Sequence, residues 1–310
     1  MPYSLTQINE AVRSDPKAFA QECDEIFHQK VENAARKIAE HRTESHVILL
    51  SGPSGSGKTT TALKIEEALE HMGIETHTIS MDNYFNTIDP ETAPRNREGN
   101  IDYESPFCLD IELLNRHFSM LDRGETIHVP KYEFARQMRS DILSQPLKLG
   151  PDELAIFEGI HALNDIIVGK NPKAFKLYIA ARSNVVDEAG AVVFQHPWLR
   201  LSRRIVRDYK FRGSDAAFTL KMWSNVRRGE KLYISPYKEN ANLMFDSSLA
   251  FEFSVLKPFV VPLLEAIPRG KYQEVDEILK AYDRIEAMDE SCIAPDSLVR
   301  EFIGGSIFTD

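Results

Sequence analysis

The chain of 310 residues contains 43% hydrophobic and 27% charged residues, with 15 glycines and 16 prolines, which excludes a chain that is collagen-like or disordered throughout. Its 47 acidic and 37 basic residues give a formal net charge of −10, which disfavours general binding to DNA or anionic membranes because like charges repel. Residues 200–231 nevertheless hold ten bases against three acids, so positive charge is concentrated in one segment.

The N-terminal residues 1–44 are expected to form a helical extension. Apolar positions spaced by three and four predict a long amphipathic helix over 16–42 and a short helix over 5–13. The long helix is expected to pack on the domain that follows, with a partner-binding arm as the alternative. The first residues lack the apolar run of a secretory signal, no stretch is apolar enough for a membrane span, and three distant cysteines favour neither disulfides nor a metal cluster. We therefore expect a cytoplasmic protein.

Short apolar runs alternate with helical segments over residues 45–260. A strand buried on both faces is predicted at 47–52 and a helix over 58–72. An amphipathic helix is expected over 107–124, and further strands are expected at 76–80, 126–132, 154–159 and 175–180. Because strands that alternate with helices form crossover units, we predict an α/β fold with a parallel sheet flanked by helices.

The remaining segments are predicted to be mainly helical. The basic segment is expected to form an arginine-rich helical lid over about 197–232, within a domain that we place at 45–260. Residues 261–310 are expected to form a helical C-terminal extension packed on the core.

Residues 52–59 carry the strongest functional signal. They read Gly-Pro-Ser-Gly-Ser-Gly-Lys-Thr and match the pattern G-x-x-x-x-G-K-[ST] in full, between an expected strand and an expected helix. Glycines let backbone amides turn toward phosphate oxygens, Lys58 can reach the β- and γ-phosphates, and the Thr59 hydroxyl can ligate Mg²⁺. The sequence therefore predicts a P-loop NTPase that binds ATP and Mg²⁺ through Gly52, Ser54, Gly55, Ser56, Gly57, Lys58, Thr59 and Thr60.

Two carboxylates follow predicted strands. Asp82 comes directly after the strand at 76–80, and Glu158 stands near the end of the strand at 154–159. The carboxyl ends of parallel strands line the ligand crevice, so both side chains are expected near the γ-phosphate. Asp82 can accept the proton of an attacking hydroxyl or hold the metal, and Glu158 can belong to the metal shell. For each carboxylate, a helix cap or turn residue is the alternative.

The basic segment offers charge for phosphoryl transfer. Arg203, Arg204 and Arg207 lie within four positions of one another, at spacings that place them on neighbouring helix faces, and Arg212 follows. Phosphoryl transfer requires positive charge over the migrating group, which a closing helix can supply while it excludes water. A solvated arginine-rich face is the alternative.

At this point the chain resembles the uridine kinase and phosphoribulokinase group of P-loop kinases. The resemblance covers about residues 46–260 and depends on ordered blocks, namely GPSGSGKTT, SMDNYF, NIDYESP, HVPKYEF, FEGI and LSRRIVRDYKFRG. Two later stretches, VRRGEKLYISPY and LVREFIGGS, are similar to a bacterial nucleoside-kinase branch. Members of that branch often carry an extra N-terminal domain, which we do not expect in this protein.

The resemblance implies a role for each matching residue. Asp82 would be the general base toward a 5′-hydroxyl and would hold Mg²⁺ with Thr59 and Glu158. Asp102 would accept hydrogen bonds from the ribose, and Tyr132 would stand against the base. The remaining implied roles are catalysis by Lys58, Arg204 and Arg207, phosphate binding by Arg203 and Arg212, and substrate binding by Tyr84, Gln137, Arg139 and Arg204.

The sequence departs from the family pattern at three places. Gln137 stands where similar pyrimidine ribonucleoside kinases often have a histidine, and Ser214 replaces an expected lid arginine. The segment 182–197 is longer than in short uridine kinases. Glutamine can donate and accept hydrogen bonds, so a pyrimidine edge stays readable, but the preferred nucleoside can differ.

These observations predict an ATP-dependent nucleoside kinase of nucleoside salvage, with uridine, cytidine or another pyrimidine nucleoside as acceptor. A homo-oligomer is an open expectation, and nucleic acid and membrane are not expected partners. One alternative is a kinase of the same fold that acts on a phosphorylated sugar or a pantothenate-like alcohol. Another is an ATP-binding regulatory or RNA-associated module, which the basic segment would favour.

Overall fold

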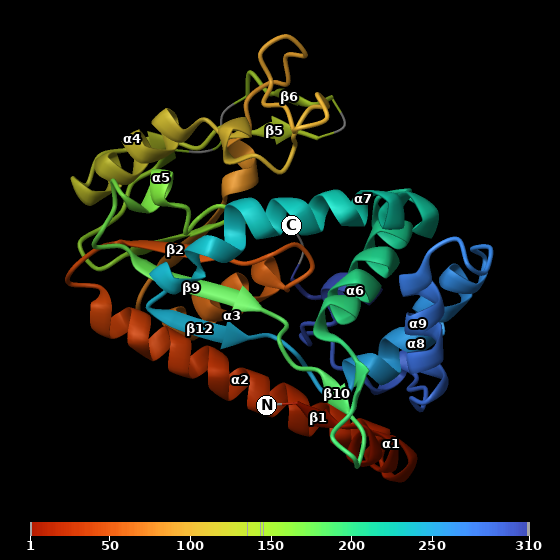
Figure 1. Cartoon of the computed structure of the whole chain (residues 1–310). Helices are drawn as coiled ribbons and strands as arrows, with labels where there is room; N and C mark the ends of the chain where they lie inside the picture. Colours follow the sequence, from red (N-terminus) through yellow and green to blue (C-terminus); the bar gives the residue numbers. More distant parts are fainter. Residues whose placement is uncertain (1, 135, 143, 145, 309–310) are drawn as a thin grey trace.

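A five-stranded parallel sheet forms the centre of the molecule (Figure 1). The computed structural model describes residues 2–134, 136–142, 144 and 146–308. Neighbouring strands follow the order β12 (Leu243–Asp246), β9 (Phe175–Ala180), β2 (Val47–Ser51), β8 (Leu154–Glu158) and β3 (Thr76–Ser80), and every pairing is parallel. The predicted α/β fold with a parallel sheet is confirmed.

The sheet has a hydrophobic cluster on each face, as its sequence demands. All five residues of β2 are buried, with Ile48 and Leu50 in one cluster and Val47 and Leu49 in the other. Because side chains alternate along a strand, a continuous apolar run can supply both clusters only when helices or loops cover both faces. The helices are α1 (Leu5–Ser14), α2 (Pro16–His41), α3 (Lys58–His71), α4 (Ile111–Asp122), α5 (Asp165–Val168), α6 (His196–Phe211), α7 (Ala216–Gly229), α8 (Glu252–Glu265), α9 (Gln273–Asp283) and α10 (Arg300–Ile303).

The long N-terminal helix is part of the main core. Helix α2 runs along one side of the sheet and packs against α3 (Figure 1). Its apolar stripe, including Phe27, Ala34 and Ile38, belongs to the same hydrophobic cluster as strands β2 and β9. Asp15 begins the helix by accepting a hydrogen bond from the Ala18 amide. The expected helix over 16–42 is therefore confirmed, and it packs on the domain that follows.

The predicted strand at 126–132 is wrong. Pro130 interrupts it, because proline lacks the N–H that a strand donates to its neighbour. The segment instead contributes to two small antiparallel sheets: β4 (Ile127–His128) pairs with β7 (Pro146–Leu147), and β5 (Tyr132–Glu133) forms a hairpin with β6 (Met138–Arg139). The β5–β6 hairpin projects from the end of the sheet near α7 (Figure 1).

The predicted helix over 107–124 begins later than expected. A short 3₁₀ turn occupies Pro106–Cys108, and α4 begins after Asp110, whose side chain caps the Leu113 amide.

A short sheet outside the expected pattern joins β1 (Tyr3–Ser4), β10 (Val185–Val186) and β11 (Val192–Phe194), so the longer 182–197 segment binds the N-terminus. Among the described helices, none combines the length and the apolar character needed to span a bilayer.

Candidate functional site

The P-loop connects β2 to α3 in the conformation that its sequence requires. Gly55 and Gly57 have φ angles of 75° and 77°, in the left-handed region that glycine adopts without strain. A Cβ atom at Gly57 would also lie 2.7 Å from a methyl group of Leu298, near the C-terminus. The glycines thus allow both the curl of the loop and its close packing against the C-terminal segment.

Two buried arginines hold the outer side of this loop. Arg200 donates to the Ser54 carbonyl at 3.0 Å and forms a bidentate pair with Glu230. Arg203 donates to the Gly55 carbonyl at 3.1 Å and to the Ser247 carbonyl at 2.9 Å. Because these donors bind loop carbonyls from outside, they stabilise the conformation in which loop amides face a phosphate.

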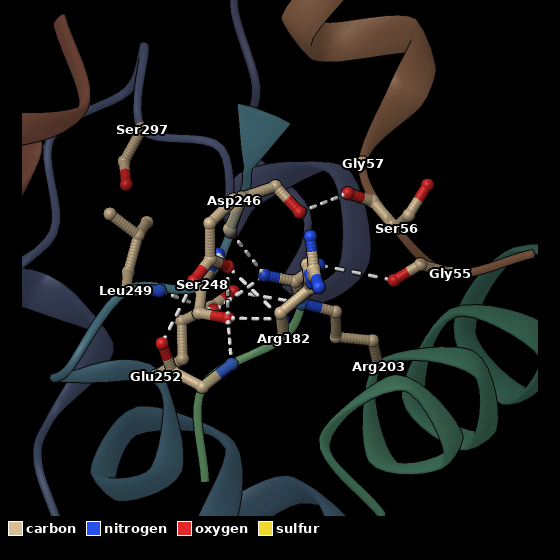
Figure 2. A network of polar contacts seen from close by, with 12 residues as sticks. Gly55, Ser56, Gly57, Arg182, Arg203, Asp246, Ser248, Leu249, Glu252 and Ser297 are labelled. Carbon is tan, nitrogen blue, oxygen red and sulfur yellow. Dashed lines mark hydrogen bonds and ion pairs between the residues drawn. The ribbon is translucent and has the colours of Figure 1, made fainter. Parts of the chain in front are cut away.

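Arg203 is paired with Glu252, and both side chains are 0% exposed (Figure 2). The Ser247 hydroxyl completes this network by donating to the Ser56 carbonyl at 2.6 Å. The expected phosphate-binding role of Arg203 is wrong, because its guanidinium is fully buried and its hydrogen bonds go to the protein. Arg203 instead supports the P-loop.

A cavity of about 350 Å³ opens where β3 and β8 end beside the P-loop. Lys58, Thr59, Asp82 and Glu158 all line it, so the four residues that the sequence linked to phosphate and metal chemistry converge. Asp82 stands in the 3₁₀ turn Met81–Tyr84 that directly follows β3. The predicted convergence of Asp82 and Glu158 at the carboxyl ends of the strands is confirmed.

Electrostatics within this cavity couple the charged groups. Burial raises the pKa of Glu158 to about 7, and the neighbouring Lys58 ammonium opposes that shift. Desolvation lowers the pKa of Lys58, while Glu158 and Asp82 raise it. The hydroxyl of Thr59 and the two carboxylates are hard oxygen donors of the kind that Mg²⁺ prefers, so these residues fit a magnesium site.

Helix α6 contributes the positive wall of the cavity through Arg204, Arg207 and Arg212. Arg204 donates to the Ser54 hydroxyl at 2.9 Å, and Arg207 is paired with Asp208 at 2.9 Å. Arg212 has a largely exposed side chain. Three of the four predicted lid arginines therefore face the cavity.

Part of the cavity wall is aromatic. Tyr132 and Gln137, from the β5–β6 hairpin, line it together with Phe85 and Phe134. The Tyr132 ring lies 5.5 Å from the Phe85 ring and 5.0 Å from the Phe134 ring, measured between centroids. The hairpin thus places an apolar wall and one side-chain amide within the same cavity as Asp82.

Two predicted substrate residues have structural partners instead. Tyr84 is fully buried, and its hydroxyl lies 2.8 Å from Nδ1 of His117. Arg139 donates to Asp110 and to the Tyr84 carbonyl, so it connects the β5–β6 hairpin to the turn after β3. The predicted contact between Tyr84 and the substrate is wrong, because the Tyr84 side chain is fully buried. In this structure Arg139 holds the hairpin in place.

Asp102 and Thr60 also have protein partners. The Asp102 carboxylate is buried and accepts hydrogen bonds from Arg228 and from the Tyr233 hydroxyl at 3.0 Å. Thr60 donates its hydroxyl to Glu301 at 2.7 Å. Neither side chain is among the described residues that line the cavity containing Asp82.

Sequence reasoning missed two acidic residues of this cavity, Glu104 and Glu301. Glu104 lies within the NIDYESP block, and burial raises its pKa to about 7. Glu301 is separated by 241 residues from Thr60, its hydrogen-bond partner. The LVREFIGGS block contained a signal for this segment, but no spacing rule connects it to the P-loop.

Comparison with known proteins gives a consistent result. A family model described as the phosphoribulokinase / uridine kinase family matches residues 47–251. The uridine kinase of Staphylococcus aureus is 30% identical over 199 residues, which are 64% of this chain and 86% of that protein. The uridine kinase of Saccharomyces cerevisiae is 25% identical over 244 residues, which are 78% of this chain but 45% of that protein, so the chain spans less than half of the yeast relative. The solved structure of a possible uridine kinase from Bacillus stearothermophilus has 19% identity and a TM-score of 0.42, over 65% of this chain and 89% of that one.

Proposed function

The chain belongs to the phosphoribulokinase / uridine kinase family, and from that premise we propose that it transfers the γ-phosphoryl group of Mg-ATP to the 5′-hydroxyl of a pyrimidine nucleoside. Family membership makes it a P-loop kinase with a small-molecule substrate. The observation that carries the choice of acceptor is that one cavity is lined both by Asp82 with the P-loop and by the aromatic Tyr132 hairpin.

Each group of the cavity has a part in the proposed transfer. Lys58 and the arginines Arg204 and Arg207 neutralise negative charge on the phosphates. Asp82 accepts the proton of the 5′-hydroxyl as its oxygen bonds to the γ-phosphorus and the bond to the β–γ bridging oxygen breaks. Magnesium, when bound by Thr59, Asp82 and Glu158, supplies further charge neutralisation.

Acceptor binding is assigned to the hairpin end of the cavity. Tyr132 offers a ring face to a base, and Gln137 offers one donor and one acceptor to a pyrimidine edge. Asp102 remains our proposed ribose ligand, although a diol reaches its carboxylate only after Arg228 or Tyr233 moves. A sugar phosphate would have no use for an aromatic wall, which favours a nucleoside acceptor.

The RNA-associated alternative loses part of its support in the structure. It depends on the basic segment, in which Arg200 and Arg203 are buried in ion pairs. Trp198 and Trp223 are also buried. Two of the ten bases and both tryptophans are therefore unavailable to a polyanion, whereas Lys210, Arg212, Lys221 and Lys231 are exposed.

The test is product analysis with purified protein and Mg-ATP. A mixture of ribonucleosides, deoxynucleosides and pentose phosphates is incubated with the enzyme, and the products are separated and identified by mass spectrometry. We expect ADP together with a pyrimidine nucleoside 5′-monophosphate. A sugar bisphosphate, or ATP consumption that no nucleoside stimulates, would contradict the proposal.

Gln137→Glu should change the choice between uridine and cytidine. The variant has nearly the same shape but loses the amide donor, so it can accept from the cytosine amino group and repels the uracil carbonyl. We expect the ratio of kcat/KM for uridine over cytidine to fall about tenfold or more. The measurement is competition between the two nucleosides at fixed ATP.

Gln29→Glu is the matched control, because Gln29 is an exposed residue of α2 and its amide donates to Glu25. Unchanged kcat/KM values for both nucleosides in the Gln137 variant would remove Gln137 from the base-binding site. A proportional loss for both nucleosides would indicate a structural effect at this residue, whose φ angle of 51° is unusual for glutamine.

A further inference from the structure

A triphosphate donor can bind this site in only one orientation, if the proposed kinase function, on which this inference rests, is correct. Lys58, Asp82 and Glu158 mark the γ-phosphate end of the donor site. The amides of a P-loop cradle the α- and β-phosphates at the start of the helix that follows. The nucleoside half of the donor is therefore expected beyond Thr59 and Thr60, on the side away from Asp82.

A second cavity, of about 380 Å³, opens at that place. It shares Thr59, Arg207, Arg212 and Glu301 with the first cavity, so the two spaces adjoin along the N-terminal turn of α3. Its volume lies in the range of small-molecule sites. Its remaining walls come from α3, the end of α6 and the C-terminal segment.

We propose that the C-terminal segment 300–308 forms the wall that binds the base and ribose of the triphosphate donor. This segment lies outside the 47–251 region that the family model matches. It contributes half of the residues that line the cavity, namely Arg300, Glu301, Gly304, Gly305, Ser306 and Phe308.

The chemistry of these walls suits a nucleoside. Phe211, at the end of α6, has an exposed ring that lines the cavity, and Phe308 stands on the C-terminal side. Aromatic rings stack on bases irrespective of sequence. Gly304 and Gly305 have positive φ angles of 95° and 76° and no side chains, so their peptide groups can approach a base edge.

Glu301 stands at the junction of the two cavities. In this structure its carboxylate accepts the Thr60 hydroxyl at 2.7 Å and faces the Thr60 amide at 3.4 Å. A carboxylate at the α-phosphate end repels phosphate but accepts hydrogen bonds from a hydroxyl, as it already does from Thr60. It therefore marks the point where the phosphate chain ends and the ribose hydroxyls begin.

The C-terminal wall is held in place by contacts to the donor site itself. Phe302 and Ile303 of α10 are buried, and Lys210 of α6 donates to the Ile303 carbonyl at 2.6 Å. Arg300 donates to the Ile293 carbonyl at 2.7 Å, and Leu298 packs against Gly57 of the P-loop. The wall is thus formed before any donor binds, which limits the entropy cost of binding.

The experiment compares two ligands, ADP and inorganic tripolyphosphate, titrated by calorimetry in the presence of Mg²⁺. The test variants are Phe211→Ala and a chain that ends at Ile303, which keeps the buried α10. Loss of a stacking face is expected to raise the Kd for ADP about tenfold in each variant. The Kd for tripolyphosphate, which has no base, is expected to stay within about twofold.

Phe218→Ala is the matched control, because Phe218 is a 54% exposed phenylalanine on α7 and Phe211 is 57% exposed on α6. An ADP affinity within twofold of wild type in the shortened chain overturns the proposal, and if that chain fails to fold, the same result in Phe308→Ala overturns it. Equal weakening of ADP and tripolyphosphate also overturns it, because the effect then belongs to the P-loop. Failure of the wild-type chain to bind either ligand would instead contradict the proposed kinase function, and the inference with it.

Discussion

Asp82→Asn should lower kcat by about 10²–10⁴-fold and leave the Kd for ADP within about twofold. The asparagine keeps the shape of Asp82 but cannot accept the proton of the attacking hydroxyl, and it is a weaker magnesium ligand. ADP binding depends mainly on the P-loop amides, Lys58 and the arginines of α6, which this substitution leaves in place. The measurements are steady-state kinetics with the nucleoside found by product analysis, and calorimetric titration with ADP.

Asp89→Asn provides the matched control for this variant. Asp89 is an exposed aspartate seven residues along the chain, and its carboxylate caps a local turn by accepting from Glu91 and Thr92. Its substitution should leave kcat near the wild-type value. Wild-type turnover by Asp82→Asn would remove Asp82 from its role as base, and parallel loss of ADP affinity would indicate a disturbed P-loop instead.

The sheet was predictable because its signals are local. Strands such as β2 and β9 are mainly apolar, and the order of strands and helices along the chain is typical of crossover units. The edge strand β12 escaped prediction because Met244 is exposed and only Phe245 is buried, which leaves almost no pattern to detect. Local signals weaken at the edge of a sheet because only part of each strand is covered there.

The centre of the site was equally predictable, but the function of each arginine was not. The P-loop motif and the strand ends placed Lys58, Asp82 and Glu158 together, because sheet topology brings strand ends to one edge. Helical spacing shows which arginines share a face, but not what packs against that face. The partner of Arg203 is Glu252, 49 residues away at the start of α8, and no sequence pattern joins the two residues.

The position of the C-terminal segment against the P-loop was also not predictable, because sequence spacing does not show which distant residues pack together. The block LVREFIGGS was recognisable as a motif, yet its position against the P-loop follows from tertiary packing of Leu298, Phe302 and Ile303. Long-range contacts of this kind set the shape of the two cavities. They also connect the C-terminal extension to α6, whose Arg204, Arg207 and Arg212 line the cavity that contains Asp82.

Glu252→Gln should lower the free energy of unfolding by about 3–5 kcal/mol, because it leaves the Arg203 guanidinium buried without a counter-charge. Glu265→Gln, at the exposed end of the same helix, is the control and should change stability by less than about 0.5 kcal/mol. Denaturant titration gives both values. A decrease in the free energy of unfolding below about 1 kcal/mol in the Glu252 variant would show that the ion pair adds little to stability.

A double variant separates stability from the support of the P-loop. Arg203→Met combined with Glu252→Leu removes both charges, and apolar replacement of a buried ion pair commonly restores most of the lost stability. The Gly55 and Ser247 carbonyls, however, still lose the guanidinium that donates to them. We therefore expect a near-wild-type free energy of unfolding together with weaker binding of tripolyphosphate, which occupies only the phosphate part of the site. A wild-type affinity for tripolyphosphate in the double variant would mean that Arg203 stabilises the fold without shaping the loop. A weaker affinity would establish that the buried Arg203 of α6 fixes the phosphate-binding conformation.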